Sequence, residues 1–132
     1  WLLDLASASQ LEMLPTGNAV RSLSTPPSPG TSNCLIENGI ISPETLIADI
    51  KKGFLVTELI GSSVSLTTGD YSRGASGYWI ENGEIAYPVT EATIAGNLKD
   101  MFLEMTPAND IDLRFSTTAP SIRIDGMMVA GG

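Results

Sequence analysis

Histidine is absent from this 132-residue chain, and cysteine occurs once, as Cys34. Without histidine the chain cannot form a Ser-His-Asp or Cys-His catalytic arrangement or a histidine-based metal site. A single cysteine cannot form a disulfide within the chain, which fits a reducing compartment. Cys34 has no histidine to activate it and precedes the apolar pair Leu35-Ile36, so we expect a small buried apolar residue there and not a nucleophile.

Positive charge and long apolar runs are also scarce. Seven Lys and Arg against 15 Asp and Glu give a formal net charge of -8. An acidic surface repels phosphate backbones, so we expect no nucleic-acid partner. No run approaches the roughly 18 apolar residues that a membrane span needs, so no membrane association is expected. The apolar opening at residues 1–3 ends at Asp4 without a preceding basic segment, which does not fit a signal peptide.

The remaining composition is that of a folded domain. Its residues are 42% hydrophobic and 17% charged, enough apolar material for a core and too little charge for a disordered tail. We expect residues 1–132 to form a single domain, a fragment cut from a longer parent chain. The Ser-, Thr- and Pro-rich residues 22–33 predict a mobile surface loop, since proline fixes φ and removes a hydrogen-bond donor.

Two short helices are predicted from capping signals and periodicity. Ser42, Pro43 and Glu44 suit the N-cap and first turn of a helix of about ten residues, with Gly53 ending it. Asn97 is the N-cap of a second helix, in which residues 98, 101, 102 and 105 share one apolar face. We interpret the methionines on that face as core, although such side chains can also line a binding groove.

The other segments read as strands joined by tight turns. Asn82-Gly83 separates two aromatic-rich runs and predicts a hairpin, because both central residues of a type I′ turn need positive φ. We also predict strands at 54–60, 112–115 and 121–124, the last turning at Asp125-Gly126 into a second hairpin with 127–129. The sequence thus predicts a mainly β (α+β) fold, an antiparallel sandwich or barrel-like sheet with two short helices.

Few residues are arranged for chemistry. Asp110 and Asp112 could place carboxylates on one strand face and hold calcium, but the spacing of a calcium loop is missing, so solvated turn acids are favoured. Residues 69–77 are more unusual, and we take Asp70, Arg73, Gly74 and Gly77 as candidate substrate- or partner-binding residues. Glycines let another chain approach closely, and Arg73 could bind a carboxylate with two parallel hydrogen bonds. The alternative is a kinked strand with an internal Asp70–Arg73 pair.

Several of these segments together resemble a known family. The strings ELIGSSVSLTTGDYSRGASGYWIENGEIAYPV (58–89) and TIAGNLKDM (93–101) look like the C-terminal domain of PmbA/TldE-like proteins, in the TldD/PmbA peptidase family. The resemblance extends to residues 16–22, 46–61 and 121–132 and so covers nearly the whole chain. Its specific part is the Gly-Asp-Tyr-Ser-Arg-Gly run with the Trp-Ile-Glu-Asn-Gly hairpin. Residues 4–11 depart from the family by lacking basic side chains.

The resemblance implies a cytoplasmic bacterial protein that pairs with a TldD-like subunit as a heterodimeric metallopeptidase, which trims unfolded or flexible peptides. In that family the TldD-like subunit carries a zinc-binding His-Glu-x-x-x-His motif and a Cys-Gly-Lys segment. The matching stretch 115–120 of this chain has no cysteine, so no metal ligand is carried over. This favours the metal-free subunit, with zinc implied on the partner and no cofactor in this chain.

The sequence leaves the functional class open. In the first hypothesis the domain lines a peptidase chamber and helps to hold an extended peptide, with residues 69–80 offering a strand edge. In the second it is a purely structural assembly domain without substrate contact. An independent hydrolase based on paired carboxylates is the third, although sequence alone cannot pair distant acids.

Overall fold

The computed structural model describes residues 4–131, which divide into two compact units. One unit contains the chain up to Ile36 together with Leu113–Thr118, and the other contains Glu37–Asp112 and the chain from Ala119 onward. The expectation of a single domain stays a prediction. None of the helices among the described residues is long and apolar enough to cross a membrane.

The smaller unit is built from short elements. Helix α1 (Leu5–Gln10) begins at Asp4, whose carboxylate accepts a 2.8 Å hydrogen bond from the Ser7 amide. Strands β1 (Ala19–Val20) and β2 (Ser28–Pro29) pair antiparallel, and β3 (Cys34–Leu35) and β8 (Thr117–Thr118) pair parallel. Helix α1 was not predicted, and β2 lies inside the predicted loop 22–33.

The expected burial of Cys34 is wrong. Its thiol is free and the residue is exposed. Strand β3 has two residues and one partner strand, and its other residue, Leu35, is 50% exposed. Thr117 of the partner strand is exposed as well, so the apolar sequence pattern is not matched by burial here.

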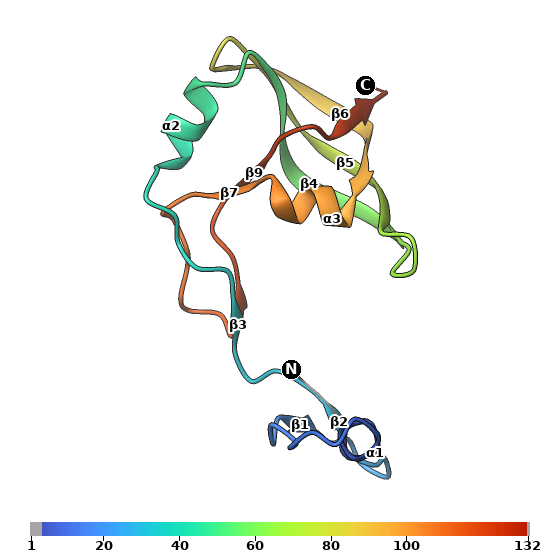
Figure 1. Ribbon diagram of the computed structural model, residues 1–132. Coiled ribbons are helices and arrows are strands. Elements are labelled where there is room, and N and C mark those ends of the chain that lie inside the picture. Colours follow the sequence, from blue (N-terminus) through green and yellow to red (C-terminus); the bar gives the residue numbers. More distant parts are fainter. Residues whose placement is uncertain (1–3, 132) are drawn as a thin grey trace. The chain divides into compact units, whose positions relative to one another are not determined.

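The larger unit is organised around an antiparallel sheet with the strand order β10-β6-β5-β4 (Figure 1). Its strands are β4 (Lys52–Val64), β5 (Asp70–Glu81), β6 (Glu84–Asn97) and β10 (Met128–Ala130). The predicted hairpin at Asn82-Gly83 is confirmed: it joins β5 to β6 with φ of 51° and 82°, both in the left-handed region that an Asn-Gly turn tolerates. The mainly β, antiparallel character is likewise confirmed, and the sheet is open, not closed into a barrel.

One face of this sheet carries the core. Ala75 and Ala92 stand opposite each other and are 0% and 1% exposed, and Ile94 beside them is 7% exposed. Helix α3 (Leu98–Leu103) and strand β9 (Ile122–Ile124) lie in front of the sheet in Figure 1. Small residues in the long central strands let the covering elements approach closely.

Helix α2 (Pro43–Ala48) begins as predicted but ends early. Ser42 is its N-cap and accepts a hydrogen bond from the Thr45 amide, with Pro43 in the first turn. The helix ends at Ala48, because the Asn82 and Gly83 amides of the hairpin bind the carbonyls of Lys51 and Ile50 at 2.9 and 2.8 Å. The prediction that Gly53 ends the helix is therefore wrong. Gly53 lies inside β4 and pairs with Ile80.

Helix α3 also ends before the predicted position. Asn97 caps it as expected by accepting a 3.1 Å bond from the Lys99 amide. It ends at Leu103, and Met105 begins strand β7 (Met105–Pro107), which pairs with β9. The predicted apolar face is only partly buried, since Leu98, Met101 and Met105 are half-buried whereas Phe102 is 67% exposed.

Two predictions near the C-terminus are wrong. Residues 113–116 form turns and bends, so the expected strand 112–115 does not exist. The turn at Asp125-Gly126 is present, with Gly126 at a φ of 79°, but the strands on either side do not pair with each other. Strand β9 pairs with β7, while β10 pairs with β6, because each has a longer-range partner that competes with the local hairpin.

Candidate functional site

A cleft of about 660 Å³ lies within the larger unit, between the core face of the sheet and the elements that cover it. Its walls are mostly apolar. Leu46 and Ile47 of α2 and Ile50 just after it lie on one side, and Ile122 and Ile124 of β9 on another. The sheet contributes residues of all four strands, namely Phe54, Leu59, Tyr71, Trp79, Ile94 and Val129. A concave, largely apolar space with few polar groups is the usual form of a binding site.

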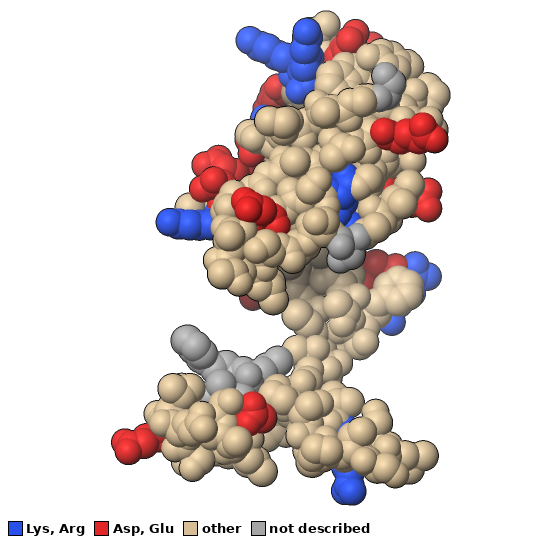
Figure 2. Space-filling model, turned by 90° about the vertical axis from the view of Figure 1, so that its right-hand side faces the viewer, with Lys and Arg blue, Asp and Glu red and all other residues tan. Residues whose placement is uncertain are grey.

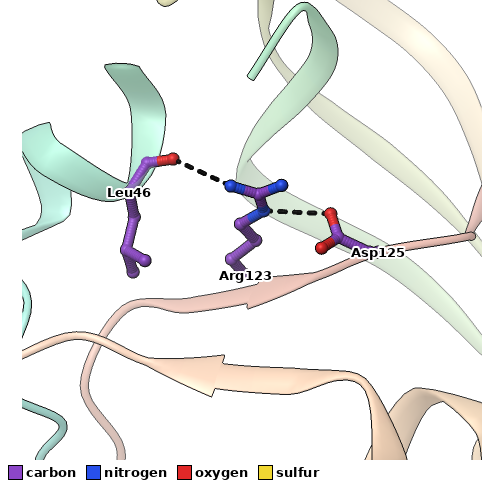
Figure 3. Close-up of polar contacts among 3 residues, drawn as sticks. All are labelled: Leu46, Arg123 and Asp125. Carbon is purple, nitrogen blue, oxygen red and sulfur yellow. Dashed lines mark hydrogen bonds and ion pairs between the residues drawn. The ribbon is translucent and has the colours of Figure 1, made fainter. Parts of the chain in front are cut away.

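Arg123 is the cation that lines this cleft from β9. Its Nε donates a 2.9 Å hydrogen bond to Asp125 Oδ1, and its Nη1 donates one of 3.4 Å to the Leu46 carbonyl of α2 (Figure 3). The guanidinium therefore joins β9 to α2, and Asp125 is its ion-pair partner. These contacts give Arg123 a structural role. Sequence reasoning did not select it, although the alternation Ile122-Arg123-Ile124 marks a strand with one polar position between apolar ones.

Arg73 of β5 lies on the same face of the sheet as this cleft. It stands opposite Ile94 of β6, which in turn stands opposite Val129 of β10. Residues directly opposite one another in antiparallel strands share a face, and both Ile94 and Val129 line the cleft. Arg73 is half-buried, and its Nε is buried without a hydrogen-bond partner among the described residues.

A β-bulge lies beside Arg73 in the neighbouring strand. The pairing of β4 with β5 shifts from Ile60↔Gly74 to Ser63↔Ser72, so two residues of β4 stand across from Arg73 alone. The first of them, Gly61, has a φ of 71°, which is the conformation that glycine supplies in this kind of bulge. Bulges bend a strand and re-aim the side chains beside them. The position of Arg73 is therefore set by a specific local irregularity.

The sequence matches, over residues 1–131, the family described as PmbA/TldA metallopeptidase C-terminal domain. The chain belongs to this family.

Individual relatives agree with this assignment. The chain is 45% identical over 99% of its length to "Metalloprotease PmbA" of Escherichia coli O157:H7, of which it spans 27%. It is 26% identical to "Metalloprotease TldD homolog" of Haemophilus influenzae, covering 99% of this chain and 31% of that protein. The crystal structure of TldE from Thermococcus kodakarensis has a TM-score of 0.84 and 28% identity, covering 99% of this chain and 31% of that one. The chain thus corresponds to about a third or less of these relatives.

The residues of this PmbA/TldA family domain do not suit a zinc site. Zinc in proteins is held mainly by His and Cys with added carboxylates, and the chain has no His and a single exposed Cys. Within residues 4–131, no group of three or more Cys, Asp and Glu side chains lies close enough to hold a metal ion.

The predicted strand edge at residues 69–80 is wrong. These residues form most of β5, which lies between β4 and β6 and is hydrogen-bonded on both sides. An added strand needs unpaired backbone groups, and a central strand has none to offer. One edge strand of the sheet is β4, which pairs with β5 alone and contributes Phe54 and Leu59 to the cleft.

The candidate residues of segment 69–77 do not act together. Asp70 accepts a 2.6 Å hydrogen bond from the Thr68 hydroxyl, and no ion pair joins it to Arg73 among the described residues. The two side chains are three positions apart on one strand, so they point to opposite faces. An internal Asp70–Arg73 pair is therefore excluded, and Arg73 stands apart from Asp70.

Gly77 has a structural reason to be glycine. A Cβ built there would meet the Leu55 carbonyl oxygen and carbon of β4, both backbone atoms, the carbon at 2.9 Å. A Cβ on Gly74 would lie at 3.4 Å from Ile60 Cβ, an ordinary contact. The close approach at Gly77 is thus made by the adjacent strand of the same sheet. A binding role for the two glycines stays a prediction.

Asp110 anchors a turn and is not arranged for calcium. Its carboxylate accepts hydrogen bonds from the Ser121 hydroxyl at 2.7 Å and the Ser121 amide at 2.8 Å. These bonds favour the ionised form and hold the pKa of Asp110 below its usual value. Next to these bonds the Ala108 amide donates a 2.8 Å hydrogen bond to the Ser121 carbonyl. Asp110 therefore helps to hold together the two ends of the segment 111–120.

This contact predicts a pH dependence. Because the folded pKa of Asp110 is lowered, its stabilising contribution is present above the unfolded pKa and is lost as pH falls through the folded value. Unfolding by urea should therefore show a smaller loss of stability between about pH 6 and about pH 3 in Asp110→Asn than in the unchanged chain. Asp49→Asn, an exposed acid without a resolved hydrogen bond to its carboxylate, serves as control. Identical acid slopes in Asp110→Asn and the unchanged chain would contradict the assignment.

Proposed function

We propose that this domain belongs to the metal-free, non-catalytic subunit of a TldD/PmbA-type metallopeptidase complex that trims unfolded peptides, with its sheet cleft helping to hold an extended peptide. The observation that carries the proposal is the difference in relationship, 45% identity to a PmbA protein against 26% to a TldD homologue. The ligand types agree with it, since neither histidine nor a buried cysteine is present among the described residues. The metal is then held by the TldD-like partner.

The cleft supports the peptide-holding part of this proposal. An extended peptide binds readily by adding to an edge strand while its side chains enter adjoining apolar pockets. Strand β4 is such an edge and borders an apolar space. Basic and acidic side chains are interspersed on the face shown in Figure 2, and the net charge of -8 favours neutral or basic peptides over strongly acidic ones. We place the complex in the cytoplasm, with which the unpaired Cys34 is compatible.

The experiment is reconstitution of the full-length protein with a TldD-like subunit. We expect neither protein alone to cleave a flexible peptide and the mixture to do so, with one subunit type, the TldD-like one, containing zinc by elemental mass spectrometry. A chelator should abolish cleavage. Cys34→Ser should leave the metal content and turnover of the mixture unchanged, because Cys34 supplies no ligand.

Three results would decide against the proposal. Cleavage by the full-length protein alone would restore an independent hydrolase. A stoichiometric metal in it, lost in Cys34→Ser, would show a metal site in this domain. Assembly with the partner that is altered by cleft substitutions such as Leu59→Ala, without any change in peptide KM, would favour the purely structural assembly domain.

A further inference from the structure

The Nε atom of Arg73 is buried and has no hydrogen-bond partner among the described residues. Buried polar atoms are almost always hydrogen-bonded, and a charged group left without an acceptor is costlier than a neutral one. A buried guanidinium nitrogen without a partner on a central strand therefore indicates that an acceptor comes from outside the described residues.

The acids of the larger unit that lie nearest in sequence or in the cleft have other partners. Asp70 accepts from Thr68, and Asp125 accepts from Arg123. On the cleft face, the neighbours of Arg73 are Tyr71 and Ala75 along β5 and Ile94 across in β6. None of these three side chains can act as an anionic acceptor for the guanidinium.

The surroundings of Arg73 also restrict the kind of acceptor. A guanidinium presents Nε and an Nη as two parallel donors, which match the two oxygens of a carboxylate. Phosphate is usually bound by several cations or a series of backbone amides, and none of the side chains beside Arg73 brings a second positive charge. The net charge of -8 further disfavours a multiply charged anion.

We propose that Arg73 is a carboxylate-binding site, and that the carboxylate is brought to the cleft face of the sheet by polypeptide other than the described residues. The bulge at Gly61 opens the neighbouring strand beside Arg73 and gives this position its orientation. Two sources share this chemistry. One is an acidic side chain of the remaining protein or of the partner subunit, and the other is a carboxylate of a bound peptide, which rests on the proposed function.

The test compares Arg73→Gln with Arg73→Lys in the full-length protein. Glutamine removes the charge at similar size, and lysine keeps the charge but loses the parallel pair of donors. Arg21→Gln is the matched control, because it removes the same charge at an exposed position in the other unit. Three quantities are measured: the unfolding midpoint of the protein alone, the Kd of assembly with the TldD-like subunit, and the Kd of a fluorescent peptide by anisotropy. The peptide is used with a free C-terminus and with an amidated one.

A carboxylate from protein predicts that Arg73→Gln lowers the unfolding midpoint or weakens assembly about tenfold or more, with equal effects on both peptides. A carboxylate from the peptide predicts that the variant loses about tenfold in affinity for the free-acid form alone, so that the two peptides bind alike. In either case the values of Arg73→Lys should fall between those of the unchanged protein and those of Arg73→Gln. Arg73→Gln values that match those of Arg21→Gln in all three measurements would overturn the proposal. The midpoint and the peptide affinity need no partner, so they still test a carboxylate from the remaining protein or from the peptide if the complex does not form and the proposed function fails.

Discussion

Replacement of Gly77 by alanine is expected to lower the free energy of unfolding of the chain by about 3 kcal/mol or more. The new Cβ would collide with the Leu55 carbonyl group of the adjacent strand, and the α-carbon of Val56 would lie 3.1 Å away. These are backbone atoms in the middle of a paired strand, so no side-chain rotation can relieve the contact. Strands β4 and β5 must separate locally, which breaks ladder hydrogen bonds in the centre of the sheet. Urea unfolding followed by far-ultraviolet circular dichroism measures the effect.

Gly74→Ala is the control for this prediction. It lies three residues away on the same strand, and its added Cβ would meet Ile60 Cβ at 3.4 Å and the Ile60 carbonyl oxygen at 3.5 Å, ordinary contacts. We expect a change within about 1 kcal/mol, since alanine also restricts the unfolded chain. Equal effects of the two substitutions would show that conformational freedom, and not the clearance of Leu55, explains Gly77.

Local chemistry determined the features that the sequence predicted well. The N-caps Ser42 and Asn97 each bind an amide within three residues, and the Asn82-Gly83 turn needs two adjacent residues at positive φ. Such signals depend on a few neighbouring residues, so they can be recognised without the fold. The sequence therefore predicted the N-termini of α2 and α3 and the position of the hairpin turn.

Elements whose limits depend on distant partners were not predicted. The lysines after α2 and the following Gly53 suit a helix end by themselves, but the amides of the Asn82-Gly83 hairpin bind the carbonyls of Ile50 and Lys51. Strands β9 and β10 were expected to pair with each other across Asp125-Gly126, whereas each pairs with a strand from an earlier segment. Tertiary pairing overrides a local preference that amounts to a few tenths of a kcal/mol per residue.

The candidate site shows the same division. The sequence indicated Arg73 as a candidate binding residue, because a lone arginine among glycines is unusual. Its place on the cleft face follows from pairing with Ile94, and the extra β4 residues across from it follow from a register shift that the sequence does not specify. Gly61 was a partial signal, since an isolated glycine in a strand often marks a bulge. The unpartnered Nε could be recognised only when all neighbours of Arg73 were placed.

Gly83→Ala is expected to destabilise the chain by about 2–4 kcal/mol for two separable reasons. Gly83 has a φ of 82°, which costs an L-residue about 1 kcal/mol. Its added Cβ would also lie 2.5 Å from the Ala48 carbonyl oxygen and 3.0 Å from the Ala48 α-carbon, in the last turn of α2. The hairpin would have to withdraw from the helix end, and the Ile50 carbonyl would lose the Gly83 amide bound at 2.8 Å.

Gly126→Ala separates these two reasons. Gly126 has a φ of 79°, but an added Cβ would have no atom within 4 Å, so this variant carries the conformational cost without the contact. The difference between the two variants in urea unfolding then measures how much the docking of the hairpin on α2 contributes. We expect Gly83→Ala to be worse by about 1–3 kcal/mol, and also to raise amide exchange at Asn82, whose bond to the Lys51 carbonyl would be lost with it. Equal destabilisation would mean that the hairpin tip does not stabilise the helix end, and the early end of α2 at Ala48 would need another cause.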